Sequence, residues 1–376
     1  MIQKLMKECN RCILTENDDS TIIIDYSGLC NYCNNYDMQL KELGTKIERN
    51  SFIEKKIKEV KQKGKNKKYD CLIGLSGGLD SSYMAYWLGK RGLRPLVVHL
   101  DNGWNSNLAT QNIKNICQKL NFDLYTHVID WEEFRTMQLA YLKASVVDIE
   151  VLTDHAIKAI ILKLSKKFKI NYVFSGFNIS TESVMIKGWT YNKNDFENIK
   201  DIVVKNSLLK KLKTYPHTTF WASLYNNFFL DVEKINLLNY IDYDKNKSKE
   251  IIKKSLNWKD YGGKHYESLF TKFYQAYLLP QKFNIDKRKV HLSNLICSKQ
   301  ITKIDAKRVL KEPLYSSDEE LNNDINFVIK KFEISIGEFN DIMNKKIKRH
   351  TDFKTHDNYW NIYFKLVDIL KLNFSR

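Results

Sequence analysis

The stretch LIGLSGGLDSS, Leu72–Ser82, decides the fold. An apolar run ends there in two adjacent glycines, an aspartate and three serines. The apolar run is typical of a buried strand, and the following SSYMAYWLGKRG has the pattern of a helix closed by Gly92. Glycines let the backbone approach an anion closely, and successive N–H groups at a helix start form a concave nest of donors. The stretch therefore predicts a phosphate-binding turn.

This turn is neither of the two common phosphate-binding motifs. A Walker A loop needs a lysine that is missing here, and the spacing differs from G-x-G-x-x-G. The plain alternative is a tight turn with a capping serine. We favour anion binding because strand, loop and helix follow one another in the required order.

Alternating strand and helix patterns continue to about residue 190. Strand-like runs recur at 94–101, 123–130 and 170–176, with helical patterns between them. Such repeated units predict an α/β fold, a doubly wound parallel sheet with helices on both faces. Strand signals then fade and helical patterns dominate. The predicted divisions are a zinc-binding module at 1–45, a basic helical connector at 46–68, the α/β domain at 69–204 and a helical domain at 205–376.

Four of the seven cysteines crowd into the start of the chain as two C-x-x-C pairs, Cys9 with Cys12 and Cys30 with Cys33. Two such pairs supply the tetrahedral sulfur set that structural Zn²⁺ prefers, with no position left for substrate. We therefore expect a structural zinc site. An iron–sulfur cluster on the same thiolates, or a redox dithiol, is the alternative.

SGGLDS resembles the SGGxDS signature of the PP-loop ATP pyrophosphatases. The chain as a whole resembles one branch of that superfamily, the N-acetyl sugar amidotransferases of bacterial surface-polysaccharide and flagellin-type glycan synthesis. The resemblance runs from about residue 8 to 315. It rests on CNRC…GLCNYC, LIGLSGGLDSSY, VVHLDNGWNS, DIEVLTDHA, SGFNISTE, NYIDY and the stretch from WKDYGGKH to HLSNLI.

The resemblance implies an ATP-dependent reaction. ATP would activate the acetamido oxygen of an N-acetyl sugar as an O-adenylate, ammonia would displace AMP, and the product would be an acetamidino sugar. Mg²⁺ would bridge the phosphate oxygens, with Asp80 and Glu182 near it. The residues expected to bind the nucleotide are Ser76, Gly77, Gly78, Asp80, Ser81, Ser82, Asp101, Ser175, Gly176, Asn178 and Glu182.

The sugar end of the site is harder to assign from sequence. Asp148 and Glu150 could contact metal, ammonia or sugar, or could serve only as helix caps. Lys287 and Arg288 could clamp phosphates or a carboxylate, or could be solvated charges. His291 is a further candidate acid or base. The residues expected to be catalytic are Asp80, Ser81, Asp154, Lys264 and His265.

Charge and composition suggest where the protein works and with what. The net charge is +17, but lysines are spread along the chain, so we expect a solvated basic surface and no nucleic-acid partner. The sequence shows no apolar run of about 20 residues and no signal-peptide core, which predicts a cytoplasmic protein without a membrane span. No glutaminase motif is recognisable, so separate glutaminase and ammonia-channelling subunits are expected.

The strongest alternative function is a tRNA-thiolating enzyme of the same superfamily. The basic charge would suit tRNA, and such enzymes also combine this loop with zinc-binding cysteines. They commonly need reactive cysteines beside the ATP site. Only the isolated Cys117 and Cys297 follow the loop, and Cys117 lies on an amphipathic pattern typical of a core position.

Overall fold

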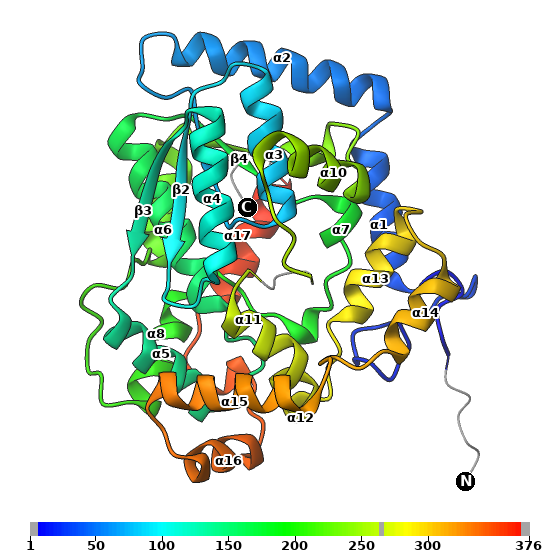
Figure 1. Ribbon diagram of the computed structural model, residues 1–376, viewed down its shortest axis with the longest axis vertical. Helices are drawn as coiled ribbons and strands as arrows, with labels where there is room; N and C mark the ends of the chain where they lie inside the picture. The colour runs from blue at the N-terminus through cyan, green and yellow to red at the C-terminus, as the bar shows by residue number, and fades with distance from the viewer. Residues whose placement is uncertain (1–6, 263–266, 370–376) are drawn as a thin grey trace.

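A five-stranded parallel sheet forms the centre of the computed structural model, which describes residues 7–262 and 267–369 (Figure 1). The strand order is β3-β2-β1-β4-β5. The chain therefore builds outward from β1 to β3, then returns to place β4 on the other side of β1. The strands are β1 Cys71–Gly74, β2 Pro95–Asp101, β3 Asp123–Val128, β4 Tyr172–Ser175 and β5 Glu233–Asn236. The four strands predicted from sequence and the doubly wound parallel fold are confirmed.

Helices cover both faces of the sheet because strand residues alternate between two cores. Ile73 packs in the cluster with α2, α3, α4 and α10, whereas its neighbour Leu72 packs in the cluster with α5, α6 and α8. The first set comprises α2 Lys46–Gly64, α3 Leu79–Lys90, α4 Asn107–Leu120 and α10 Lys245–Leu256. The second comprises α5 Trp131–Ala144, α6 Val151–Phe168 and α8 Phe196–Asn206.

The fifth strand was missed by the sequence analysis. Glu233–Asn236 pairs in parallel with β4, with Tyr172 opposite Glu233. It has four residues, and only Ile235 is buried, so the apolar pattern that marks the other strands is absent. The strand belongs to the segment expected to be helical, so the sheet takes its last strand from beyond residue 204.

Most of the remaining helices lie late in the chain. They are α1 Asn31–Glu42, α7 Ile179–Glu182, α9 Phe220–Phe229, α11 Leu269–Phe273, α12 Leu279–Phe283, α13 Arg288–Cys297, α14 Lys303–Lys311, α15 Asp318–Phe332, α16 Ile336–Asn344 and α17 Asp357–Ile369. The 3₁₀ turns η1 Lys187–Trp189, η2 Leu237–Asn239 and η4 His350–Asp352, and a π-helical turn η3 Tyr274–Leu278, complete the set. Among the described helices, none combines the length and apolar character needed to cross a membrane.

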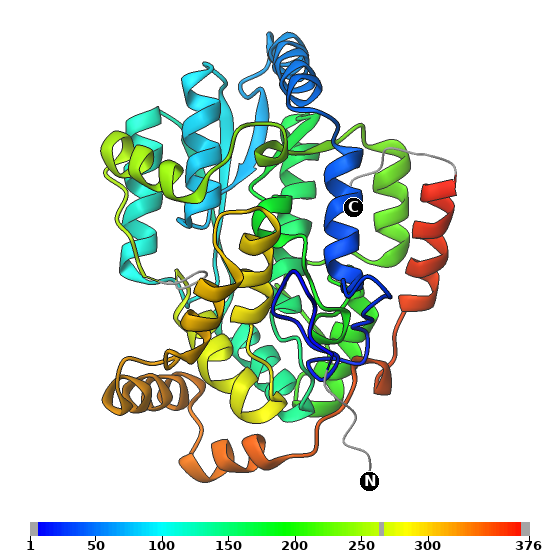
Figure 2. The ribbon, with the colours of Figure 1, turned by 90° about the vertical axis from the view of Figure 1, so that its right-hand side faces the viewer.

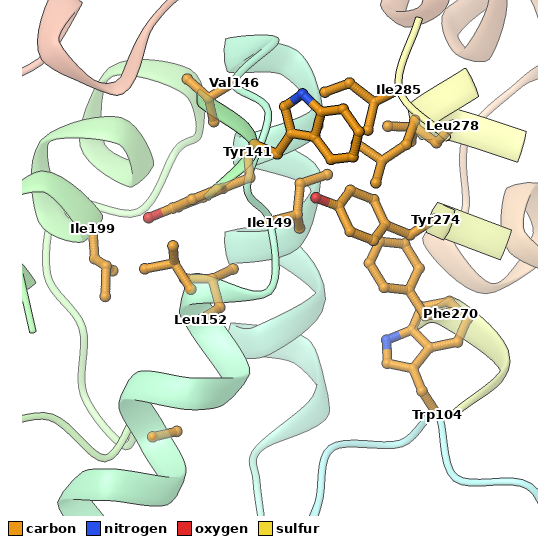
Figure 3. Packing of buried hydrophobic residues seen from close by; sticks show 14 of the residues in the cluster. Trp104, Tyr141, Val146, Ile149, Leu152, Ile199, Phe270, Tyr274, Leu278 and Ile285 are labelled. Atoms are coloured by element: carbon orange, nitrogen blue, oxygen red, sulfur yellow. The ribbon is translucent and has the colours of Figure 1, made fainter. Parts of the chain in front are cut away.

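Trp104 joins the sheet domain to the late helices. Its side chain is fully buried, and its ring centroid lies 5.0 Å from that of Phe270 and 5.4 Å from that of Phe332. Its indole N–H donates to Gln138 Oε1 at 2.7 Å. Figure 3 shows Trp104, Phe270 and Tyr274 following one another through this core. The DNGW segment at the end of β2 therefore carries the tryptophan on which the C-terminal helices pack.

Replacing Trp104 with alanine should lower the free energy of unfolding by about 3–5 kcal/mol, because a large cavity opens where the two parts meet. Urea denaturation followed by circular dichroism measures this. Trp221→Ala on α9 is the matched control, since that side chain is 70% exposed and its loss should cost under about 0.5 kcal/mol. Equal losses in the two variants would contradict the assigned role.

Candidate functional site

The glycine loop connects β1 to α3 at the point where the strand order reverses. Helix α3 starts at Leu79, and its N-cap Gly78 provides no side-chain cap. Gly77 has φ +83°, and a Cβ there would lie 2.7 Å from Ala109 O, so this position accepts only glycine. At the helix start, Leu79 N–H donates to the hydroxyl of Tyr261 at 3.2 Å, and the positive dipole end of α3 faces the loop.

Hydroxyl groups brace this loop from inside. Ser76 Oγ and Ser81 Oγ lie 3.3 Å apart, Gly78 N–H donates to Ser76 Oγ at 3.2 Å, and Ser81 Oγ donates to Gly78 O at 3.2 Å. Ser82 differs, because its side chain is fully buried and its Oγ has no partner among the described residues. The loop is thus held in a preformed shape by two of its three serines.

Asp80 points from the first turn of α3 toward the loop after β4. Its carboxylate accepts hydrogen bonds from the hydroxyl of Tyr243 and, at 3.4 Å, from Thr181 Oγ1. Burial and the Asp80 charge raise the pKa of Tyr243 well above its usual value, so Tyr243 remains a donor. Gly176 also packs here, since a Cβ on it would lie 3.2 Å from Ser81 N. The two loops at the reversal point therefore form one surface.

A cavity of about 410 Å³ opens over this surface. Its floor is the glycine loop together with Gly176, Thr181 and Glu182. One side is formed by Lys245 and Lys249 of α10 with Trp258, Asp260, Tyr261 and Gly262, and the opposite side by Glu267, Gln275, Ala276, Lys287, Arg288, His291, Leu292, Leu295, Val309 and Leu314. The walls thus come from segments that are far from the loop in sequence.

Six residues expected to bind the nucleotide line this cavity: Ser76, Gly78, Asp80, Ser81, Gly176 and Glu182. Gly77 is not among the lining residues, and its carbonyl accepts a hydrogen bond from Trp258 Nε1 at 2.9 Å. Lys264 and His265, expected to be catalytic, lie outside the described residues.

Other expected site residues are not among those that line the cavity. Asp101 Oδ1 accepts from Gly103 N–H at 3.0 Å and so closes the turn after β2. Ser175 Oγ accepts from Phe177 N–H at 3.2 Å, and Asn178 Oδ1 caps α7 by accepting from Thr181 N–H at 2.9 Å. Like Ser82, these side chains shape the loops that carry the site.

Asp154 belongs to a separate charged group centred on Lys193. Lys193 Nζ lies 2.6 Å from Asp148 Oδ2 and 3.4 Å from Asp154 Oδ2. Burial alone would raise the pKa of Asp148, but the Lys193 ammonium lowers it below the ordinary value. Glu150 accepts a hydrogen bond from Thr271 Oγ1 at 3.2 Å. The acids of DIEVLTD therefore anchor neighbouring segments instead of lining the cavity.

Comparison with known proteins bears on the wall opposite α10. Residues 267–367 match the family described as "LPS biosynthesis protein WbpG-like, C-terminal domain". We call residues 267–367 the WbpG-like domain, after the family description that this segment matches. Residues of this domain from Glu267 to Leu314 line part of the cavity.

The other similarities are partial. A 59-residue stretch is 39% identical to the tRNA(Ile)-lysidine synthase of Chlamydia pneumoniae, covering 15% of this chain and 18% of that protein. The NMN synthetase of Francisella tularensis overlaps with a TM-score of 0.33 at 14% identity, covering 74% of this chain and 97% of that one. The U34-tRNA thiolase NcsA of Methanococcus maripaludis, with its [4Fe-4S] cluster, has a TM-score of 0.32 at 15% identity, covering 84% and 93%. The chain spans less than a fifth of the curated relative, and the structural overlaps are loose.

Lys287 and Arg288 of the WbpG-like domain differ sharply in environment. The Arg288 guanidinium binds Asp286 and also donates to three carbonyls, those of Val309, Leu310 and Glu312. Lys287 Nζ has no hydrogen bond or ion pair with any described residue, and burial lowers its pKa although Asp148 opposes the shift. Arg288 is therefore structural, and Lys287 offers the cavity a cation that pairs with none of the residues the structure describes.

Several aromatic hydroxyl and indole groups that shape the site had been given no role from sequence. Tyr243 holds Asp80, Trp258 holds Gly77, and the Tyr261 hydroxyl accepts from Leu79 N–H at 3.2 Å. They lie in NYIDY and WKDYGG, two stretches that carried the family resemblance without individual assignments. Each of these side chains joins a large apolar ring to one polar group, and this is the feature of the sequence that could have predicted their role.

The four cysteines of the N-terminal module form a group that could hold a metal ion. All four are fully buried, and their sulfurs lie within 4.8 Å of one another. Cys9 and Cys33 are 3.7 Å apart, and Cys12 and Cys30 are 3.6 Å apart. Four sulfurs about 2.3 Å from one central ion stand roughly 3.8 Å apart, so the arrangement fits a single tetrahedral ion.

Exchanging Lys287 and Arg288 separately for methionine should give opposite results. Lys287→Met should leave the free energy of unfolding unchanged or raise it, because it removes a partly buried charge that lacks a partner. Arg288→Met should lower it by about 2 kcal/mol, since Asp286 and three carbonyls lose their donor. Urea denaturation distinguishes the two. A clear loss of stability in Lys287→Met would show that this lysine is structural.

Proposed function

We propose that the chain is an ATP-dependent, AMP-forming amidotransferase that converts the acetamido group of an N-acetyl sugar into an acetamidino group in surface-glycan biosynthesis. One observation carries the proposal: the preformed anion-binding loop and the WbpG-like domain line the same cavity. A phosphate-binding turn alone suits many reactions. Facing a domain of a lipopolysaccharide biosynthesis family, it suits activation of a glycan precursor.

The glycine loop is suited to the pyrophosphate part of ATP. The positive end of α3 and the side chains of Ser76 and Ser81 lie at the cavity, where they would meet phosphate oxygens. Asp80 and Glu182 line the same cavity and would hold Mg²⁺, a hard cation that prefers carboxylate oxygens and neutralises phosphate charge. The loop needs no rearrangement on binding, because its internal hydrogen bonds already fix it.

The WbpG-like wall is suited to the sugar. Gln275 on the π-helical turn η3 offers an amide donor and acceptor, and Lys287 offers the unpartnered cation. The acetamido oxygen attacks the α-phosphorus and pyrophosphate leaves. Ammonia then adds to the activated carbon, a proton is lost and AMP departs with the former acetamido oxygen. His291 also lines the cavity and is our candidate for accepting that proton.

Placement of the two later cysteines favours amidation over thiolation. Cys117 is buried on α4 in the core beneath the sheet, and Cys297 is buried beside the metal module. Neither is among the residues lining the cavity. A persulfide carrier would have to reach the activated carbon, so these positions do not suit sulfur transfer. The bound ion we propose is structural Zn²⁺, because the sulfur spacing fits one ion better than a larger iron–sulfur cube.

Incubating the protein with ATP, an ammonium salt and a panel of N-acetyl sugars should form AMP and lower the mass of one sugar by about one unit. Asp80→Asn should reduce the rate roughly 100-fold or more, because it removes a charge from the metal and phosphate site. Asp101→Asn is the matched control, since Asp101 closes a turn outside the cavity and its amide can still accept from Gly103. Formation of ADP, or full activity in Asp80→Asn, would contradict the adenylation step.

A separate glutaminase should supply the ammonia. The chain alone should therefore turn over with ammonium and stay inactive with glutamine, measured by AMP release under matched conditions. Adding a glutaminase and its channelling subunit should restore turnover with glutamine. Full glutamine-dependent activity of the isolated chain would overturn this part of the proposal.

A further inference from the structure

A fifth sulfur lies against the four-cysteine group. Cys297 Sγ is 3.6 Å from Cys33 Sγ, although the two residues are 264 positions apart in sequence. The Cys297 side chain is only 3% exposed. Cys297 is the last residue of α13, inside the WbpG-like domain, so the contact joins the metal module to the domain that lines the cavity.

Cys297 is placed beside the metal group without being part of it. The set whose sulfurs all lie within 4.8 Å consists of Cys9, Cys12, Cys30 and Cys33, and a tetrahedral ion takes four ligands. Cys297 is therefore a neighbour of the four-cysteine set, and its Sγ lies within sulfur hydrogen-bond distance of Cys33 Sγ.

Other contacts link the same two parts of the chain. Arg11 Nη2 donates to Cys297 O at 3.1 Å, and Lys303 Nζ of α14 donates to Cys9 O at 2.6 Å. Lys289 of α13 pairs with Asp18 of the module. Figure 2 shows the N-terminal loops, in dark blue, lying along α13 and α14. Arg11, the Cys9 carbonyl and Asp18 of the module are thus each bonded to α13 or α14.

Helix α13 connects this junction to the cavity. Its first turn follows Lys287, and its residues His291, Leu292 and Leu295 line the cavity. Its last residue touches the metal group. A helix of ten residues has little stability of its own, so its position depends on what holds its ends.

We propose that Cys297 is a positioning residue through which the four-cysteine metal centre holds α13, and with it the cavity wall. The contact between Cys297 Sγ and Cys33 Sγ, together with the hydrogen bond from Arg11 to Cys297 O, fixes the end of the helix on the four-cysteine group. Without the ion, the knuckles lose their common centre and α13 loses that anchor. The proposal does not depend on the adenylation chemistry.

Hydrogen–deuterium exchange of residues 288–297 in the full-length, metal-loaded protein tests the proposal. Cys297→Ala should speed exchange of this segment roughly three- to tenfold, the factor expected for loss of one hydrogen bond, with metal content unchanged. Cys297→Ser keeps a donor and should stay closer to the unaltered protein. Cys117→Ala is the matched control, because it removes a buried thiol far from the metal group and should leave α13 unaffected.

A second measurement uses the unaltered protein. Removing the metal with a chelator should speed exchange of 288–297 at least as much as Cys297→Ala does, and the Cys297→Ala protein should give up its metal to a chromophoric chelator faster. Unchanged exchange of α13 in both cases would overturn the proposal. Loss of metal from Cys297→Ala as isolated would also overturn it, because Cys297 would then be a ligand.

Discussion

The close approach of Gly77 to the backbone of α4 is the constraint on which the site depends. A positive φ and a Cβ position 2.7 Å from Ala109 O leave room for no side chain. This contact lets the chain turn sharply at the reversal of strand order and enter α3 from a glycine N-cap, with Leu79 N–H donating to the Tyr261 hydroxyl. The indole N–H of Trp258 donates to the Gly77 carbonyl, so the turn is held between α4 and the segment that follows α10.

Local sequence was enough to predict four of the five strands and the glycine loop. Glycines and serines between a buried strand and a helix dictate a donor-rich turn, and Ser76, Gly78, Asp80 and Ser81 all reach the cavity. Side-chain direction within that turn was less predictable. Ser82 lies one residue further along α3, and the helical rotation carries its hydroxyl into the core.

Three features could not be predicted from the sequence: the position of Asp101 relative to the cavity, the short fifth strand, and the long-range contacts that form the cavity walls. Asp101 lies at the end of β2, on the edge of the sheet where the cavity opens. The cavity occupies only part of that edge, and the Asp101 carboxylate accepts a hydrogen bond within its own turn. β5 is too short and too polar to show a strand pattern, because an edge strand with one buried residue needs no more. The cavity walls arise from residues 245–262 and 267–314 folding back over the loop, a contact that no local pattern encodes.

The metal module explains how such a distant wall can be held in place. Helices α13 and α14 have ten and nine residues, too few to be stable without packing. The module that supports them is itself too small to bury a large core, so a tetrahedral ion is an efficient way to make it rigid. Ion pairs such as Lys289 with Asp18 then dock the helices on a fixed surface. Residues of the WbpG-like domain thus line the cavity, and the N-terminal module contacts the helices α13 and α14 that carry some of them.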